Sequence, residues 1–125
     1  MAKMALVVDD SMLIRHSVCR YLEERGFAVE SATNGVEALE ILKTVIPDII
    51  ITDLMMPKMD GHELITKLKA TPATAEIPIV VIAGRRSQPG SPEPKANFVI
   101  FKDIAIESQL AKALQSALGE GMVSV

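Results

Sequence analysis

Short apolar runs alternate along the chain with longer segments in which apolar residues recur at helical spacing. The first pattern predicts strands and the second predicts helices, and their alternation is typical of βα units built around a parallel sheet. The expected strands are 5–8, 28–32, 49–52, 79–83 and 98–101. The expected helices are one between Ser11 and Gly26, then 36–44, 62–70 and 106–118. The pattern therefore predicts an α/β fold.

The first expected helix carries signals at both ends. Ser11 is a residue type that caps helix N-termini, and Gly26 suits the position just past a C-terminus. Between them, one face collects the apolar residues Ile14, Val18, Tyr21 and Leu22. Cys19 is the only cysteine of the chain, and we expect it to behave as a small buried hydrophobe.

Residues 84–97 interrupt the alternation. They contain three prolines and two glycines and have no apolar stripe. A proline inside a helix costs about 3 kcal/mol, which nothing in this segment would offset. We therefore expect an atypical loop at 84–97, where a fourth helix belongs, and a flexible tail at 119–125.

Length and charge narrow the possible functions. The 125 residues fit one domain spanning 1–125, and a net charge of −3 offers no overall attraction to DNA or to anionic membranes. Aromatic residues make up only 3%, too few for base-stacking platforms. A single cysteine suits a reducing compartment, and no apolar run is long enough to span a membrane. We expect a cytoplasmic protein with no DNA partner and no membrane insertion.

Candidate chemistry gathers where strands end. Asp9 and Asp10 follow the first expected strand, and Asp53 follows the third. In an open parallel sheet the carboxyl ends of the strands form the ligand-binding edge, so these carboxylates should converge. Oxygen ligands without His or Cys favour Mg²⁺. Lys102, at the end of the fifth expected strand, would neutralise a phosphoryl group carried by Asp53.

Three features together resemble the response-regulator receiver domain, which is CheY-like: VVDDS at 7–11, DLMMPKMDG at 53–61, and Lys102. The resemblance spans nearly the whole chain and implies a flavodoxin-like, doubly wound sheet of order 2-1-3-4-5. It implies that Asp53 accepts a phosphoryl group, that Lys102 pairs with it, and that Mg²⁺ binds Asp53, Asp10, Asp9 partly through water, and the Met55 carbonyl. Implied partners are a sensor histidine kinase or phosphotransfer protein and a downstream protein target in a two-component phosphorelay. Such a domain has no enzymatic activity beyond its own phosphotransfer and dephosphorylation.

The chain departs from the family pattern in its switch residues. Ala83, followed by Gly84, stands where receivers usually have Thr or Ser, so one hydrogen bond to a phosphoryl group is lost. Val99 stands where a switch aromatic is usual, and Asp103 replaces the proline that usually follows the lysine. These changes spare the expected metal site and impair the expected output coupling.

Residues 84–98 suggest an alternative function. Arg85, Arg86 and Lys95 against Glu93 give this segment a local charge of +2. Arginine pairs bind phosphates bidentately and read guanine edges. The segment resembles, more weakly, the subgroup of CheY-like proteins that bind cyclic di-GMP and act at the flagellar motor, with Arg85, Arg86 and Ser87 as binding residues and phosphorylation vestigial. Two other interpretations remain. The segment is a solvated basic loop, or the protein is a docking scaffold that uses neither phosphorylation nor cyclic di-GMP.

Overall fold

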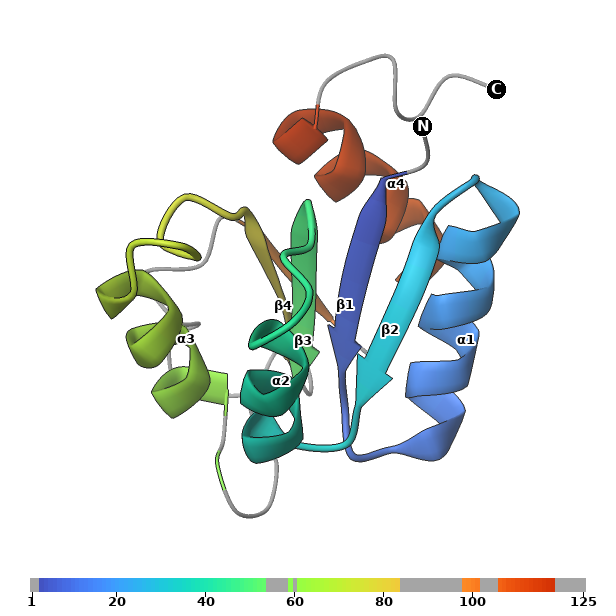
Figure 1. Ribbon diagram of the computed structural model, residues 1–125. Coiled ribbons are helices and arrows are strands. Elements are labelled where there is room, and N and C mark those ends of the chain that lie inside the picture. Colours follow the sequence, from blue (N-terminus) through green and yellow to red (C-terminus); the bar gives the residue numbers. More distant parts are fainter. Residues whose placement is uncertain (1–2, 54–58, 60, 84–97, 102–105, 119–125) are drawn as a thin grey trace.

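Strands and helices alternate from the start of the described chain to residue 83 (Figure 1). The computed structural model describes residues 3–53, 59, 61–83, 98–101 and 106–118. In chain order its elements are β1 (Met4–Val8), α1 (Met12–Glu24), β2 (Ala28–Ala32), α2 (Gly35–Leu42), β3 (Ile49–Asp53), α3 (Gly61–Ala70), β4 (Ile79–Ala83), β5 (Phe98–Phe101) and α4 (Ile106–Leu118). The predicted α/β class is confirmed. The loop expected at 84–97 and the tail expected at 119–125 lie outside the described residues.

The strands form one parallel sheet in the order β2-β1-β3-β4-β5. β1 lies between β2 and β3, and β3 in turn pairs with β4. The order β2-β1-β3-β4 confirms what the family resemblance implies for these strands. At the far edge β5 pairs with β4, with Ala83 opposite Phe101.

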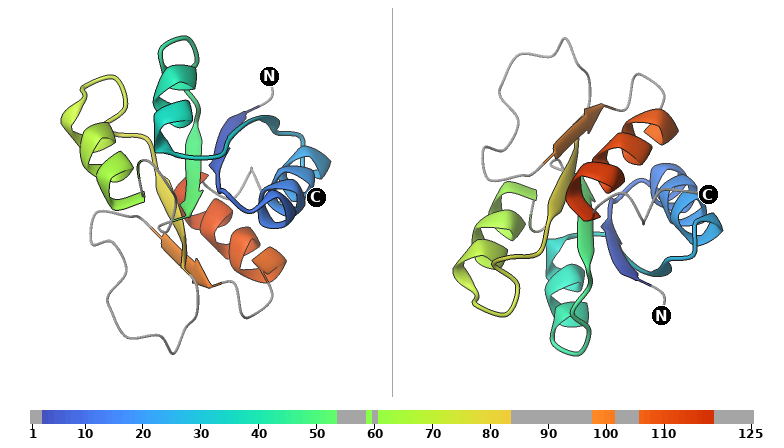
Figure 2. Two further views of the ribbon diagram at one scale, coloured as in Figure 1. Left: turned by 90° about the horizontal axis from the view of Figure 1, so that it is seen from below. Right: turned by 90° about the horizontal axis from the view of Figure 1, so that it is seen from above.

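Helices cover both faces of the sheet, α1 and α4 on one side and α2 and α3 on the other (Figure 2). The apolar side chains accordingly divide into two clusters. One packs Leu22 and Leu114 against alternate strand residues, and the other packs Leu64 and Leu68 against the strand residues between them. Because β1 and β3 are covered on both faces, β3 is buried throughout and β1 is buried from Ala5 to Val8.

The ends of α1 are as predicted. The Ser11 hydroxyl accepts a hydrogen bond from the Ile14 amide at 3.3 Å, and Gly26 has a φ of +90°. A left-handed residue at this position is the usual way to end a helix, and glycine adopts it without steric cost.

Some predicted boundaries were wrong by one or two residues. α2 begins at Gly35 instead of 36 because Asn34 caps it, and it ends at Leu42 instead of 44. After Leu42 the amide of Lys43 bonds to the carbonyl of Glu40, three residues back, which tightens the turn and ends the regular helix. β1, β3 and α3 are each one residue longer than predicted.

The prediction that Cys19 is buried was also wrong, because this side chain is only partly buried. Cys19 lies on the side of α1 that faces β2. Since β2 is an edge strand, no further strand extends the sheet beyond it. Cys19 therefore lies at an apolar position of the helix, but solvent still reaches its side chain.

Candidate acidic site

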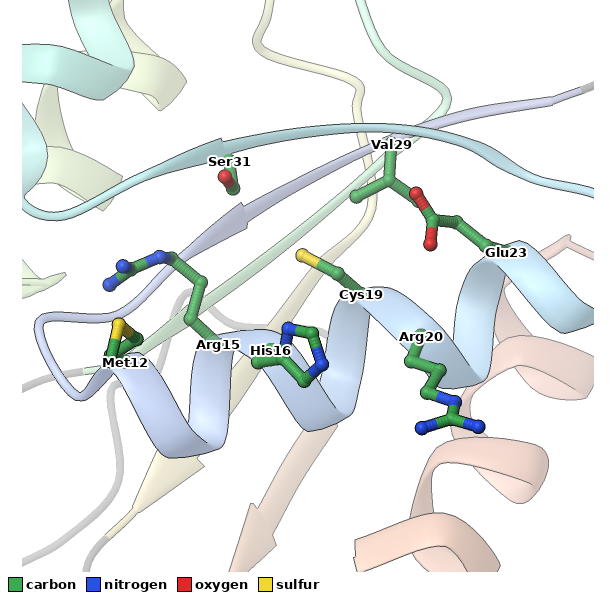
Figure 3. A pocket seen from close by; sticks show the side chains of 8 residues that line it. All are labelled: Met12, Arg15, His16, Cys19, Arg20, Glu23, Val29 and Ser31. Carbon is green, nitrogen blue, oxygen red and sulfur yellow. The ribbon is translucent and has the colours of Figure 1, made fainter.

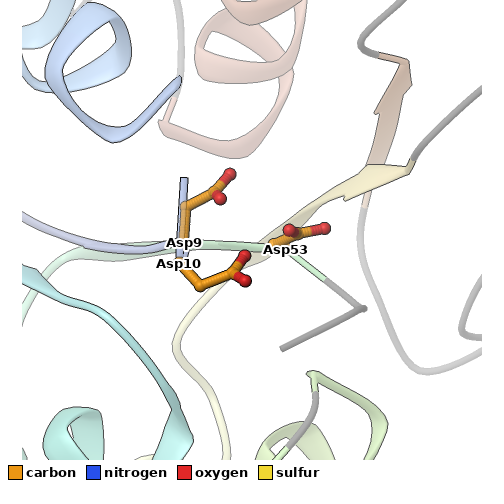
Figure 4. A group of neighbouring side chains, drawn as sticks. All are labelled: Asp9, Asp10 and Asp53. Carbon is orange, nitrogen blue, oxygen red and sulfur yellow. The ribbon is translucent and has the colours of Figure 1, made fainter. Parts of the chain in front are cut away.

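Three carboxylates meet at the carboxyl edge of the sheet (Figure 4). Asp9 and Asp10 follow β1, and Asp53 is the last residue of β3. β1 and β3 are hydrogen-bonded neighbours, with Val8 opposite Thr52. One carboxylate oxygen from each aspartate lies within 4.8 Å of the other two. The predicted convergence of these residues is thus present in the structure.

Burial differs among the three. Asp9 is 0% exposed and Asp53 is 3% exposed, whereas Asp10 is exposed to solvent. A buried carboxylate loses its hydration and requires hydrogen-bond donors or a cation in exchange. One donor is the Ser11 amide, which lies 2.8 Å from Asp9 Oδ1. The cluster therefore has two buried carboxylates and one that solvent reaches.

Hydrogen bonds fix the backbone on which these side chains stand. The Arg15 guanidinium donates to the Asp9 carbonyl at 2.7 Å, and the Asp9 amide donates to the Ala32 carbonyl of β2 at 3.1 Å. The Thr52 hydroxyl donates to the Asp53 carbonyl at 2.9 Å. The carboxylates are thus presented from a backbone that is anchored on both strands.

This donor set fits Mg²⁺. Magnesium takes oxygen ligands, commonly one or two carboxylates, and keeps several waters that a phosphoryl oxygen can replace. The cluster offers carboxylate oxygens alone, with no histidine or cysteine among its members. Three like charges so close together repel one another, and a bound cation would offset this repulsion.

The other predicted site residues lie outside the part of the chain that the structure describes. They are Lys102, Met55, Arg85, Arg86 and Ser87. Of the residues that depart from the family pattern, Ala83 ends β4 and Val99 lies in β5 opposite Val81. Their roles stay predictions.

Sequence reasoning missed three features of the structure around the site. Arg15 has no motif of its own, and only its position on the first turns of α1 places it within reach of the Asp9 carbonyl. The Asn34-to-Glu37 spacing is a capping pattern that could have located the start of α2. The packing of Met59 against Gly35 has no sequence signal.

A separate groove of about 720 Å³ lies between α1 and the edge strand β2 (Figure 3). Arg15 belongs both to this groove and, through its bond to Asp9, to the acidic site. The groove is lined by Met12, Arg15, His16, Cys19, Arg20, Glu23, Val29 and Ser31. Its floor includes the sulfur of Cys19, which points toward β2.

Burial and the nearby carboxylate of Glu23 raise the pKa of the Cys19 thiol, partly opposed by Arg15. Since the thiolate is the nucleophile, Cys19 should react with iodoacetamide more slowly than free cysteine near neutral pH, and the rate should rise with pH. Glu23→Gln removes a negative charge and should lower this pKa and speed alkylation, measured by mass spectrometry. Glu24→Gln is the matched control, because Glu24 pairs with Arg20 on the exposed side. Equal rates in both variants would contradict the role of Glu23.

The model of the response regulator receiver domain matches residues 5–115. This chain therefore belongs to the response regulator receiver family, a family of signalling domains that bind Mg²⁺ at an acidic site. Among curated relatives, response regulator MprA of Mycobacterium ulcerans (strain Agy99) is 37% identical over 110 residues, which cover 86% of this chain and 47% of that protein. The chain thus spans about half the length of the curated relatives it matches.

Solved structures give the same family. Chemotaxis response regulator CheY4 of Vibrio cholerae is 31% identical, with a TM-score of 0.85 over 94% of this chain and 100% of that one. The receiver domain of sensor histidine kinase PA1611 from Pseudomonas aeruginosa has a TM-score of 0.83 over 96% of this chain and 100% of that one; its 20% identity shows the fold alone. Within the described residues, no helix is long and apolar enough to cross a membrane.

Proposed function

We propose that this receiver domain accepts a phosphoryl group on Asp53 in two-component signalling, with Mg²⁺ held by the acidic cluster. The observation that carries the proposal is the approach of three carboxylates to within 4.8 Å at the carboxyl edge of the sheet. Asp53 is the nucleophile because it terminates a rigid central strand and matches the family's phosphoacceptor position. Asp10 and Asp53 bind the cation directly, Asp9 acts partly through water, and the Met55 carbonyl is a further ligand.

The transfer itself is a substitution at phosphorus. A carboxylate oxygen of Asp53 forms the new P–O bond as the donor's bond to phosphorus breaks, and the donor leaves with the electron pair. When bound, Mg²⁺ neutralises the charge on the phosphoryl oxygens. Asp9 and Asp10 would hold the cation, and Lys102 would pair with the phosphoryl group.

Magnesium as the cation is supported by the donor chemistry and by a structure of the same fold. The PA1611 receiver domain has a magnesium ion coordinated in its active-site cleft. Its fold resembles this chain throughout, and the carboxylates here lie at the carboxyl edge of an equivalent sheet. The phosphodonor partner is a sensor histidine kinase or a phosphotransfer protein, and the output is contact with a downstream protein.

Titration with Mg²⁺ and treatment with acetyl phosphate test this function. Binding should be weak and should shift the NMR signals of Asp9, Asp10 and Asp53, since the cation keeps several of its waters. Acetyl phosphate should add one phosphoryl group by intact-mass spectrometry in the presence of Mg²⁺ and none with excess EDTA. Absence of both the shifts and the label would overturn the proposal.

The basic segment supports a second candidate function, cyclic di-GMP binding through Arg85, Arg86 and Ser87. It rests on the local charge of +2 in a chain of net charge −3 and on the loss of the switch hydroxyl at Ala83. Calorimetry should show a saturable heat that salt weakens, because the contacts to phosphate are ionic. The double variant Arg85→Ala/Arg86→Ala should lose it, whereas Arg20→Ala/Lys43→Ala, which removes two exposed cations elsewhere, should keep it. No saturable heat in the wild type would contradict this function.

A further inference from the structure

The N-terminus of α2 is hydrogen-bonded to Met59, which lies between β3 and α3 in the chain. The amide of Gly35, the first residue of α2, donates to the Met59 carbonyl at 3.2 Å. Met59 lies six residues after Asp53 and two before the start of α3. The first amides of a helix have no partner within the helix, so this one is available to a carbonyl from another segment. The connection between β3 and α3 is therefore anchored at Asp53 in the sheet and at Met59 on α2.

Steric contact reinforces this anchor. The side chain of Met59 lies against Gly35, so closely that a β-carbon on residue 35 would stand 2.7 Å from Met59 Cγ and 2.9 Å from its Sδ. Carbon atoms in favourable contact lie about 3.5–4.0 Å apart. Gly26, by contrast, has the positive φ of +90° and no atom within 4 Å of its missing β-carbon. A larger residue at position 35 would therefore require Met59 to shift.

The surface that receives Met59 is itself rigid. Asn34, which caps α2, is 4% exposed, and its side-chain oxygen accepts from the Glu37 amide at 2.9 Å. The Glu37 carboxylate in turn accepts from the Thr33 amide at 2.8 Å. Met59 also packs on the apolar cluster beneath α2 and α3. The position of Met59 is thus set by a capped helix end and by the core.

We propose that Gly35 and Met59 are positioning residues for the acidic site. Only five residues separate Met59 from Asp53 in the sequence, so the place of Met59 limits the positions that the chain can take after the phosphoacceptor. This inference rests on the proposed function, since that function supplies the cation. A β-carbon at residue 35 would force Met59 to shift, and we expect this shift to disturb the place of the Asp53 carboxylate.

Two glycine substitutions separate positioning from general stability. Gly35→Ala should weaken Mg²⁺ binding about tenfold, the lower end of the loss seen when residues supporting metal ligands are replaced. Gly26→Ala is the matched control, because it strains a positive φ far from the acidic site and lowers stability without touching Met59. Mg²⁺ affinity is measured by NMR titration, and the unfolding midpoint is measured in the same samples. Gly26→Ala should keep wild-type affinity.

A second variant covers the case in which Gly35→Ala does not fold. Met59→Ala removes most of the contact while leaving the helix end intact, and it should also weaken Mg²⁺ binding. Where all variants fold, the double variant should lose less affinity than the sum of the two single losses, because both changes act on one contact. Wild-type affinity in either Gly35→Ala or Met59→Ala would overturn the inference.

The Mg²⁺ titration of the wild type distinguishes failure of the proposed function from failure of this inference. If the wild type shows no Mg²⁺-dependent shifts, the metal function is wrong, and positioning is then read from the Asp53 amide signal without metal. Movement of that signal in Gly35→Ala or Met59→Ala, and not in Gly26→Ala, would support the positioning role. An unmoved Asp53 signal would overturn it.

Discussion

We expect Asp53→Asn to abolish Mg²⁺-dependent labelling of the chain by acetyl phosphate. The carboxylate oxygen attacks phosphorus as acetate leaves, and the neutral amide of asparagine is too weak a nucleophile to replace it. Asp53 is nearly fully buried at the end of a central strand, which fixes its place in the cluster. Intact-mass spectrometry measures the label.

The matched control for this experiment is Asp48→Asn. Asp48 is exposed and directly precedes the same strand at its opposite end, where it accepts a hydrogen bond from the Met4 amide. It removes the same charge from the chain without touching the acidic cluster, so it should be labelled like the wild type. Equal labelling of Asp53→Asn and wild type would show that the phosphoacceptor is another residue.

The largest loss of stability is expected from Leu64→Ala. Leu64 is 0% exposed and packs between α3 and the sheet, so truncation leaves a cavity that the surrounding side chains fill only in part. Substitutions of this kind lower the free energy of unfolding by about 2–5 kcal/mol. Chemical denaturation followed by circular dichroism measures the change.

Leu13→Ala is the same substitution on an exposed helix surface. Leu13 is 75% exposed on α1, so shortening its side chain changes the buried apolar area very little. The free energy of unfolding should change by no more than about 0.5 kcal/mol. A loss at Leu13 comparable to that at Leu64 would mean that Leu13 is covered in solution.

Sequence patterns correctly predicted structural features that are set by residues close together in the chain. Ser11 and Gly26 act within one turn of their own helix, so their residue types sufficed to place the ends of α1. The carboxylate cluster was also predictable, because Asp9 and Asp53 follow strands whose carboxyl ends must share one edge.

Features that depend on distant neighbours were missed. Helical spacing gives the direction in which Cys19 points, but only the position of β2 at the sheet edge leaves that direction half open. The helix predicted at 36–44 starts one residue earlier, because Asn34 caps it and the Gly35 amide bonds to the Met59 carbonyl. Arg15 reaches Asp9 only because α1 folds back over β1.

The alternation of β1 between the two clusters makes its length intolerant of change. Leu6 belongs to the cluster under α2 and α3, and Val7 belongs to the cluster under α1 and α4. Inserting one residue between Val7 and Asp9 would turn every preceding or following side chain to the opposite face. The same insertion would take Asp9 out of line with Asp53. The spacing from this strand to its aspartates is therefore constrained by packing and by chemistry at once.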